Sequence, residues 1–254
     1  MSAKSVYLIS GANRGVGYGL VATLAARPKT VVFAGARDPT AQSLTELSAK
    51  YSNVHPVKLT SGDEADNAAA VAEIQKRAGQ LDVVIANAGI SKYRGPIANT
   101  PPSEFRDHWE VNTLGPIVLF QAAHALLLAS PSGVPTFALI SSAVGSIGGY
   151  LPRSVAAYGS SKAAANFLVK VLDSEHPALI SLAIHPGWAA TDMGNALAVA
   201  RGRDHAAVPV EDSVAGILSR IDGATKERTS GRFWNFKAVF EGNPWDIETD
   251  EIPW

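Results

Sequence analysis

The sequence predicts an α/β fold in which helices cover both faces of one doubly wound parallel sheet of about seven strands. Short segments that are apolar at nearly every position alternate with longer segments of helical periodicity. Strands that are apolar on both faces belong to buried parallel sheets. Six strands can be placed in this way, at residues 5–10, 30–34, 54–59, 81–86, 136–141 and 179–184.

The segments between these strands are long enough for helices and are expected at 15–27, 40–51, 63–79, 103–129, 154–176 and 209–222. Pro102 and Ser103 are typical of a helix start, and His176 followed by Pro177 ends the preceding helix. The alternation is a series of βαβ units, which predicts a sheet of the Rossmann type. No linker or repeat interrupts it, so residues 1–254 are expected to form a single domain.

Composition excludes several classes of function. No window approaches the roughly 20 uninterrupted apolar residues of a membrane helix. The first residues run directly into a strand, leaving no room for a cleavable signal. We therefore expect a cytoplasmic protein without a membrane contact. The chain has no cysteine, and no metal site is predicted. Its 22 basic and 23 acidic residues, without a Lys/Arg run, argue against nucleic-acid binding.

A glycine-rich turn, with Gly11, Gly15 and Gly17, follows the first strand and opens the next helix. Such a turn lets the backbone approach a pyrophosphate, whose charge the helix N-terminus stabilises. The spacing is GxxxGxG, and a turn of this kind can also be only a tight strand-to-helix connection. Its position at the start of a βαβ unit favours a nucleotide site.

The end of the second strand indicates which nucleotide is bound. An acidic side chain there accepts from a ribose 2′-hydroxyl, but this chain has Arg37, which offers a planar donor to a 2′-phosphate. Arg14, inside the turn, can approach from the other side. The two arginines favour NADPH over NADH. In the alternative, both are solvated surface residues and Asp38 neutralises Arg37.

Four polar residues indicate the chemistry. Tyr158 and Lys162 are four residues apart on one helix and so share a face. An ammonium beside a phenol favours the ionised phenol and gives a proton donor usable near neutral pH. Ser142 follows the fifth strand at the carboxyl edge of the sheet. Asn112 lies in mid-helix, where an amide has low propensity, and its alternative role is to bond a backbone carbonyl.

Together these motifs resemble the short-chain dehydrogenase/reductase family over essentially the whole chain. The resemblance is carried by the glycine turn, Asn87-Ala-Gly89, Asn112, Ser142, Tyr158-x-x-x-Lys162, Pro186-Gly187 and Thr191. Within the family, the runs 111–116, 185–193, 212–217 and 251–254 are similar to sniffer-like carbonyl reductases and to fungal ketoreductases of the norsolorinic acid type.

The resemblance implies a role for each catalytic residue. Tyr158 would give a proton to a substrate carbonyl oxygen that Ser142 holds. Lys162 would lower the pKa of the tyrosine and bind the nicotinamide ribose, and Asn112 would keep a water that connects Lys162 to solvent. The implied cofactor contacts are Gly11, Asn13, Arg14, Gly15, Val16, Gly17, Arg37, Asn87, Ala88, Gly89, Tyr158, Lys162, Pro186, Gly187 and Thr191.

One position departs from the family pattern. The acidic residue that usually follows the third strand and touches adenine is Thr60 here, although Asp63 follows closely. A serine hydrolase is disfavoured because no histidine is placed to activate Ser142. His185 is more typical of packing than of a catalytic base.

The segment 188–208 contains Gly194 and Gly202, follows the sixth strand and is expected to be a substrate lid. Apolar side chains flank the reacting centre and favour a bulky apolar or aromatic ketone: Ile147, Tyr150, Leu151, Trp188, Met193 and Leu197. The expected activity is that of an NADPH-dependent carbonyl reductase. The alternatives are an NADH-dependent secondary alcohol dehydrogenase and a catalytically silent nucleotide-sensing protein. The family often pairs subunits through its long helices, which favours a homodimer or homotetramer; the alternative is a monomer.

Overall fold

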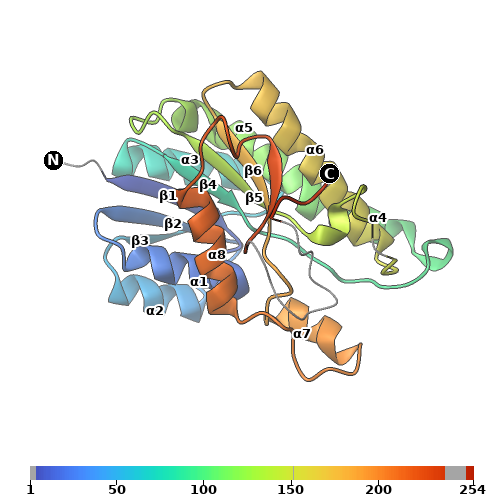
Figure 1. Ribbon diagram of the computed structural model, residues 1–254. Helices are drawn as coiled ribbons and strands as arrows, with labels where there is room; N and C mark the ends of the chain where they lie inside the picture. Colours follow the sequence, from blue (N-terminus) through green and yellow to red (C-terminus); the bar gives the residue numbers. More distant parts are fainter. Residues whose placement is uncertain (1–3, 151, 238–249) are drawn as a thin grey trace.

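The computed structural model describes residues 4–150, 152–237 and 250–254 and contains one seven-stranded parallel sheet (Figure 1). The strand order is β3-β2-β1-β4-β5-β6-β7. The strands are β1 (Ser5–Ser10), β2 (Thr30–Ala36), β3 (Val54–Lys58), β4 (Val83–Ala86), β5 (Thr136–Ile140), β6 (Ile180–His185) and β7 (Arg232–Asn235). Ile9 in β1 lies opposite Ala34 in β2 and Ile85 in β4. The strand order reverses between β1 and β4, and ligands bind beyond the carboxyl ends of the strands at such a point.

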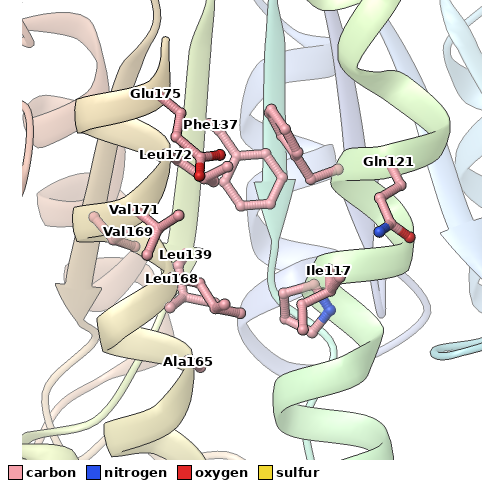
Figure 2. A pocket seen from close by; sticks show the side chains of 12 residues that line it. Ile117, Gln121, Phe137, Leu139, Ala165, Leu168, Val169, Val171, Leu172 and Glu175 are labelled. Carbon is pink, nitrogen blue, oxygen red and sulfur yellow. The ribbon is translucent and has the colours of Figure 1, made fainter.

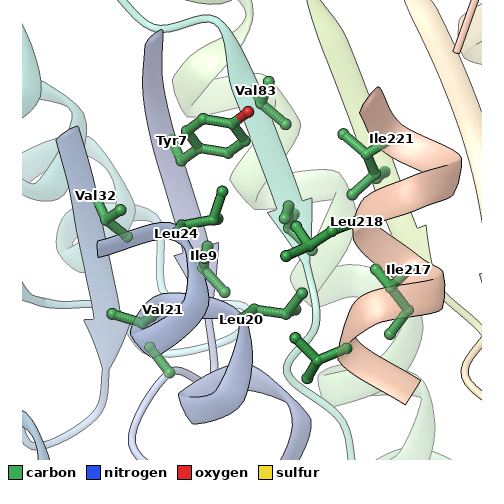
Figure 3. Close-up of a cluster of buried hydrophobic side chains, with 14 of the residues drawn as sticks. Tyr7, Ile9, Leu20, Val21, Leu24, Val32, Val83, Ile217, Leu218 and Ile221 are labelled. Atoms are coloured by element: carbon green, nitrogen blue, oxygen red, sulfur yellow. The ribbon is translucent and has the colours of Figure 1, made fainter. Parts of the chain in front are cut away.

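Helices cover both faces of the sheet, as the sequence predicts (Figure 1). One face carries α1 (Gly15–Ala25), α2 (Gln42–Lys50) and α8 (Val210–Asp222), and the other carries α3 (Glu64–Ala78), α5 (Gly115–Leu128) and α6 (Ala156–Glu175). Successive residues of a strand point to opposite faces. Tyr7 and Ile9 therefore pack against Leu20, Leu24 and Leu218 in one core (Figure 3), while Val6 and Leu8 belong to the other.

The predicted helix at 103–129 is interrupted. It consists of α4 (Pro102–Trp109) and α5, joined by the π-helical turn Glu110–Leu114. Pro116 has no N–H to donate to the carbonyl of Asn112, so the α-helical ladder cannot continue unchanged through this turn. Turns of this kind are frequent at functional sites. The deviation therefore falls at a residue that the sequence marks as functional.

The stretch Pro102–Leu128 is also long and apolar enough to cross a membrane by length and composition. Half of its most apolar window is buried inside the fold. Its apolar side chains include Leu119 and Phe120, which pack against the sheet. Burial of this kind is the ordinary property of a core helix.

Two elements were not placed from the sequence. The seventh strand, β7, has only four residues, and Arg232 at its start is exposed. The predicted lid contains a short helix, α7 (Asp192–Val199). Two hydrogen bonds join the ends of this segment, from Ala190 N to Val208 O (2.8 Å) and from Val208 N to Trp188 O (3.0 Å).

Candidate active site

Tyr158 and Lys162 lie in the first two turns of α6, at the carboxyl edge of the sheet. Ser142 lies two residues after the end of β5, and its side chain interacts with the Tyr158 phenol strongly enough to influence the pKa of that phenol. Burial raises the pKa of the Tyr158 phenol, and the bond to Ser142 opposes that rise. The structure thus brings the predicted proton donor and its serine partner together.

Lys162 is almost completely buried, and its Nζ donates a hydrogen bond to the carbonyl of Ile140 (2.8 Å). Burial lowers the pKa of Lys162 to about 8. The expected lowering of the Tyr158 pKa by Lys162 is not found in this arrangement, because burial dominates and the ammonium is directed at a backbone carbonyl. Gly89, the last residue of the predicted Asn-Ala-Gly turn, lies next to this amine, because a Cβ added at Gly89 would be 3.4 Å from Lys162 Nζ.

Both polar atoms of the Asn112 side chain hydrogen-bond to other segments of the chain, the loop after β4 and the helix α6. Its Oδ1 accepts from Ile90 N (2.8 Å), and its Nδ2 donates to Ile90 O (2.9 Å) and to Ser161 Oγ (3.0 Å). The alternative drawn from the sequence, a buried amide bonded to a backbone carbonyl, is therefore observed. Its relation to a water near Lys162 stays a prediction.

Two residues that the sequence did not single out support the tyrosine. Ser161 Oγ donates to the Tyr158 carbonyl (2.7 Å) as well as contacting Asn112. The ring of His108 packs edge-on against the Tyr158 ring, with centroids 6.3 Å apart. Ser161 adjoins Lys162 in the chain, which is a usable signal, whereas His108 is brought close only by the packing of α4 on α6.

The glycine turn has the shape required to hold a phosphate. Gly11 and Gly15 have φ angles of 66° and 54°, and a Cβ on Gly17 would lie 2.2 Å from the carbonyl oxygen of Gly11. The helix that follows, α1, has no side-chain cap at its N-terminal residue Arg14 and no acidic residue in its first turn. Its first N–H groups are thus available to an anion, which fits the pyrophosphate of a dinucleotide. Val16 lies in this first turn.

Ser10, which the sequence did not identify, ties the glycine turn to the loop after β4. Its Oγ accepts from the backbone N–H groups of Asn87 and Ala88, both at 3.0 Å. The Asn87 side chain donates to the carbonyls of Ser10 (2.9 Å) and Gly11 (3.2 Å). On the other side of the turn, the carbonyl of Asn13 accepts from Ser43 Oγ (2.7 Å). These contacts fix the turn on both sides.

Arg37 is exposed directly after β2. Asp38 accepts instead from the backbone N–H and the Oγ1 of Thr40 (2.9 and 2.6 Å), and these bonds lower the pKa of its carboxyl group. Arg37 makes no ion pair within the described residues, so Asp38 does not neutralise it. Arg14 reaches Asp192 of α7 at 3.7 Å, a weak contact between two exposed side chains.

The loop after β6 faces the glycine turn. Thr191 caps α7 by accepting from Gly194 N (3.2 Å), and a Cβ on Gly15 would lie 3.1 Å from the Thr191 methyl group. Gly187 has a φ of 73°, and the Pro186 carbonyl accepts from Ser213 Oγ (2.7 Å). Thr191, predicted on the nicotinamide side, thus lies next to the phosphate turn.

His185 is buried at the end of β6, and its Nδ1 has no hydrogen-bond partner within the described part of the chain. Burial and the charge of Arg153 lower the pKa of this imidazole to about 3. The ring is neutral at physiological pH, as expected of a packing residue. Among residues 4–150, 152–237 and 250–254, no group of three or more His, Asp or Glu side chains could hold a metal ion.

Of the six apolar side chains expected around the substrate, three are exposed: Ile147, Tyr150 and Met193. Trp188 and Leu197, both in the predicted lid, are half-buried. Leu151 lies outside the described residues. The loop containing Ile147 is anchored by the chain's last residue, since Gly148 N donates to Trp254 O (2.6 Å).

A separate apolar cavity of about 240 Å³ lies between α5 and α6 (Figure 2). Ile117 and Phe120 of α5, Phe137 of β5, and Leu168 and Leu172 of α6 line it. Tyr158 and Ser142 are not among its lining residues. This cavity is therefore distinct from the catalytic edge of the sheet.

Residues 5–201 match the family model described as short chain dehydrogenase. The match covers well over half of the chain and includes the glycine turn, Ser142, Tyr158 and Lys162. The chain belongs to this family of oxidoreductases.

Curated relatives and solved structures agree with the family. The chain is 39% identical to a norsolorinic acid ketoreductase of Dothistroma septosporum, over 91% of this chain and 90% of the relative. It is 40% identical to the norsolorinic acid ketoreductase of Aspergillus parasiticus, over 91% and 88%. The NADPH-bound carbonyl reductase from chicken fatty liver matches with a TM-score of 0.83 and 32% identity, and the carbonyl reductase Sniffer of D. melanogaster with 0.85 and 28%; both cover the whole of each chain.

Proposed function

We propose that this protein is an NADPH-dependent carbonyl reductase that reduces a bulky apolar or aromatic ketone with Tyr158 as the general acid. The observation that carries the proposal is the side-chain interaction of Ser142 with Tyr158, with the buried Lys162 one turn further along the same helix. The reverse reaction, oxidation of a secondary alcohol, uses the same groups.

The hydroxyl groups of Ser142 and Tyr158 can stabilise the negative charge that develops on the substrate oxygen during ketone reduction. NADPH supplies the hydride when it is bound. As the hydride reaches the carbonyl carbon, negative charge grows on the oxygen, and the hydroxyl groups of Ser142 and Tyr158 donate hydrogen bonds to it. Tyr158 then gives its proton to the oxygen. Burial lowers the pKa of the Lys162 amine to about 8, so Lys162 can give up a proton near neutral pH and return it to the tyrosine.

The preference for NADPH rests on Arg37 and Arg14. Both are exposed beside the turn, and a guanidinium binds a phosphate through paired donors. NADPH is named in the structure from chicken fatty liver, which supports the same cofactor here. The alternative, an NADH-dependent secondary alcohol dehydrogenase, requires that neither arginine contribute to cofactor binding.

The substrate class rests on the exposed apolar side chains at the site edge and on the two ketoreductase relatives. The segment 188–208 would close over the substrate as a lid. For the assembly, we propose a homodimer or homotetramer formed through α5 and α6 in the cytoplasm, without nucleic-acid or membrane contact. Phe167, exposed on α6, and the apolar cavity between the two helices support this pairing.

The test is to incubate the purified protein with NADPH and a panel of aryl ketones while following the absorbance of the reduced nicotinamide. The expected result is ketone-dependent NADPH oxidation that is faster than with NADH, and Tyr158→Phe serves as the catalytic blank. Tight NADPH binding without turnover of any ketone would instead support the nucleotide-sensing alternative.

A further inference from the structure

The stretch 250–254, called here the tail segment, lies about a hundred residues after the catalytic serine in sequence but packs close to it in the fold. It runs along the outer edge of β7, the last strand of the sheet. Ile252 N donates to Phe233 O (2.7 Å), and Asn235 N donates to Asp250 O (2.9 Å). These bonds satisfy backbone groups that an edge strand otherwise leaves unpaired.

Two side chains anchor the tail segment in the fold. Ile252 is fully buried in the core that contains Phe233. The ring of Trp254 stacks on the ring of Phe233, with centroids 5.8 Å apart, and Nζ of Lys170 lies 5.5 Å from the centre of the Trp254 ring. Lys170 belongs to α6, the helix that carries the catalytic tyrosine. The tail segment is thus held against both β7 and α6.

The tail segment in turn holds the loop that follows the catalytic serine. Ser146 Oγ donates a hydrogen bond to Pro253 O, and Gly148 N donates to Trp254 O (2.6 Å). A Cβ added at Gly148 would lie 3.2 Å from Pro253 Cβ, and one added at Gly149 would lie 3.3 Å from Pro253 Cγ. The two glycines therefore allow the loop and the tail segment to approach closely.

Ser146 also ends the short turn that Ser142 begins. The turn is a 3₁₀ helix with Ser142 at its N-cap. Gly145 N donates to Ser142 O (2.8 Å), and Ser146 N donates to Ala143 O (3.0 Å). Ser146 is buried, and its Oγ also accepts from Gly149 N (2.8 Å). Only this one turn separates the residue bound to the tail segment from the serine that interacts with the catalytic phenol.

The opposite side of the turn is held by α6. Asn166 Nδ2 donates to Gly145 O (3.3 Å), and its Oδ1 accepts from Ser141 Oγ (2.5 Å). A Cβ added at Gly145 would lie 2.8 Å from Lys162 Cβ, so the turn packs directly on the catalytic helix. The turn is therefore fixed by α6 on one side and, through Ser146, by the tail segment on the other.

We propose that the tail segment is a positioning element for catalysis, which acts through Ser146 to fix the turn that places the Ser142 hydroxyl against Tyr158. A hydroxyl that stabilises a developing oxyanion is effective only when it is held in place before the reaction, and small displacements of such a group are costly. The inference rests on the proposed ketone reduction for the reaction in which Ser142 acts. Ser146 and Trp254 are then positioning residues that affect the rate through Ser142.

The test measures the single-turnover rate of NADPH oxidation with a saturating aryl ketone. In Ser146→Ala this rate should fall about tenfold, because Ser142 is less well oriented, while the NADPH dissociation constant stays at the wild-type value. Trp254→Ala should give a smaller loss, and Trp254→Phe, which keeps a stacking ring, should restore most of it. An unchanged rate in Ser146→Ala overturns the proposal.

A double-mutant cycle shows whether Ser146 acts through Ser142. In the Ser142→Ala background there is no hydroxyl to position, so adding Ser146→Ala should lower the rate little further. The same fold loss in both backgrounds would mean that Ser146 acts by another route, and this result also overturns the proposal.

The matched control is Ser181→Ala. Ser181 is buried at the start of β6, and its Oγ donates to the carbonyl of Val169 (2.9 Å), so the variant loses the same kind of bond away from the turn. Urea denaturation should show a similar loss of stability in Ser181→Ala and Ser146→Ala, with the wild-type rate kept only in Ser181→Ala. An equal loss of rate in Ser181→Ala would show that the rate follows general stability, which contradicts a positioning role.

Amide hydrogen exchange separates this inference from the proposed function, because it needs no turnover. In Ser146→Ala the N–H groups of Gly145 and Gly149 should exchange faster than in the wild type, whereas Ser181→Ala should leave them unchanged. Faster exchange in a protein that reduces no ketone supports the hold of the tail segment on the turn and contradicts the proposed reductase. Unchanged exchange in Ser146→Ala overturns the positioning role whatever the activity.

Discussion

The two halves of the sheet contribute different kinds of chemical group to the site. Around β1 and β2, the site consists of backbone N–H groups at the uncapped start of α1 and of the exposed side chains Arg14 and Arg37. Beyond β4, it consists of side chains whose pKa values burial has shifted, Tyr158 and Lys162. The first half is suited to hold a charged ligand and the second to move protons. Cofactor affinity and turnover should therefore respond to different mutations.

A comparison of two helix starts within the first half shows that α1 is better suited than α3 to bind an anion. In α3, Asp63 caps the N-terminus by accepting from Asp66 N (2.8 Å), and Glu64 and Asp66 add negative charge to the first turn. In α1, no side chain caps the first turn and no acid lies in it. Both helices follow parallel strands, but only α1 leaves its positive end available.

The largest effect that would separate the two halves is expected from Tyr158→Phe. Removing the phenolic proton should lower kcat for ketone reduction at least about 100-fold, the usual contribution of a general acid. The NADPH dissociation constant should change little, because the glycine turn is untouched. Steady-state kinetics and fluorescence titration with NADPH measure the two quantities. A variant that keeps near wild-type turnover would show that another group is the acid.

Arg37→Asp tests the first half alone. Loss of a charge-assisted contact to the 2′-phosphate should weaken NADPH binding by about 2 kcal/mol, or about 30-fold in dissociation constant. NADH binding should not weaken, because that cofactor has no 2′-phosphate. Calorimetry with both cofactors gives the comparison, and Arg77→Asp is the control for the loss of a surface arginine. An unchanged NADPH affinity would remove Arg37 from the site.

Lys162, in the second half of the sheet, should make the free energy of unfolding depend on pH. Its pKa is about 8 in the fold and near 10.4 in an unfolded chain, so between these values the unfolded chain binds more protons. The free energy of unfolding should therefore rise with pH in this window, by on the order of 1 kcal/mol between pH 7 and pH 9. Lys162→Met should lack this rise. Urea denaturation without cofactor at pH 7, 8 and 9 tests it, and parallel curves for the two proteins would contradict it.

The smallest effect is expected at the capped helix. Asp63→Ala should lower the free energy of unfolding by about 1 kcal/mol, the usual cost of losing an N-cap. NADPH affinity and kcat should stay at wild-type values, because α3 already satisfies its own N-terminus. Urea denaturation and cofactor titration provide the two readouts. A loss of NADPH affinity in this variant would mean that Asp63 takes part in adenine binding after all.

Much of the fold followed from local patterns. Strands that are buried on both faces, such as β1 and β6, were predicted close to their observed bounds, because they are apolar at nearly every position. The helices between the strands were predicted in the same way. The strand β7 was not placed, since four residues with an exposed Arg232 give no such signal. The π-helical turn around Asn112 was not predicted. Pro116, which removes one hydrogen bond of the α-helical ladder, lies four residues later in a segment whose apolar pattern is that of one continuous helix.

The sequence by itself determined the family, the sheet and the residues Ser142, Tyr158 and Lys162, because their types and spacings are local properties of the chain. Only the tertiary structure decided the electrostatics, since a pKa depends on burial and on neighbours distant in sequence. It directed Lys162 to a backbone carbonyl and raised the pKa of the phenol. It also packed the ring of His108 against the ring of Tyr158, a contact between two helices that no local pattern in the sequence records.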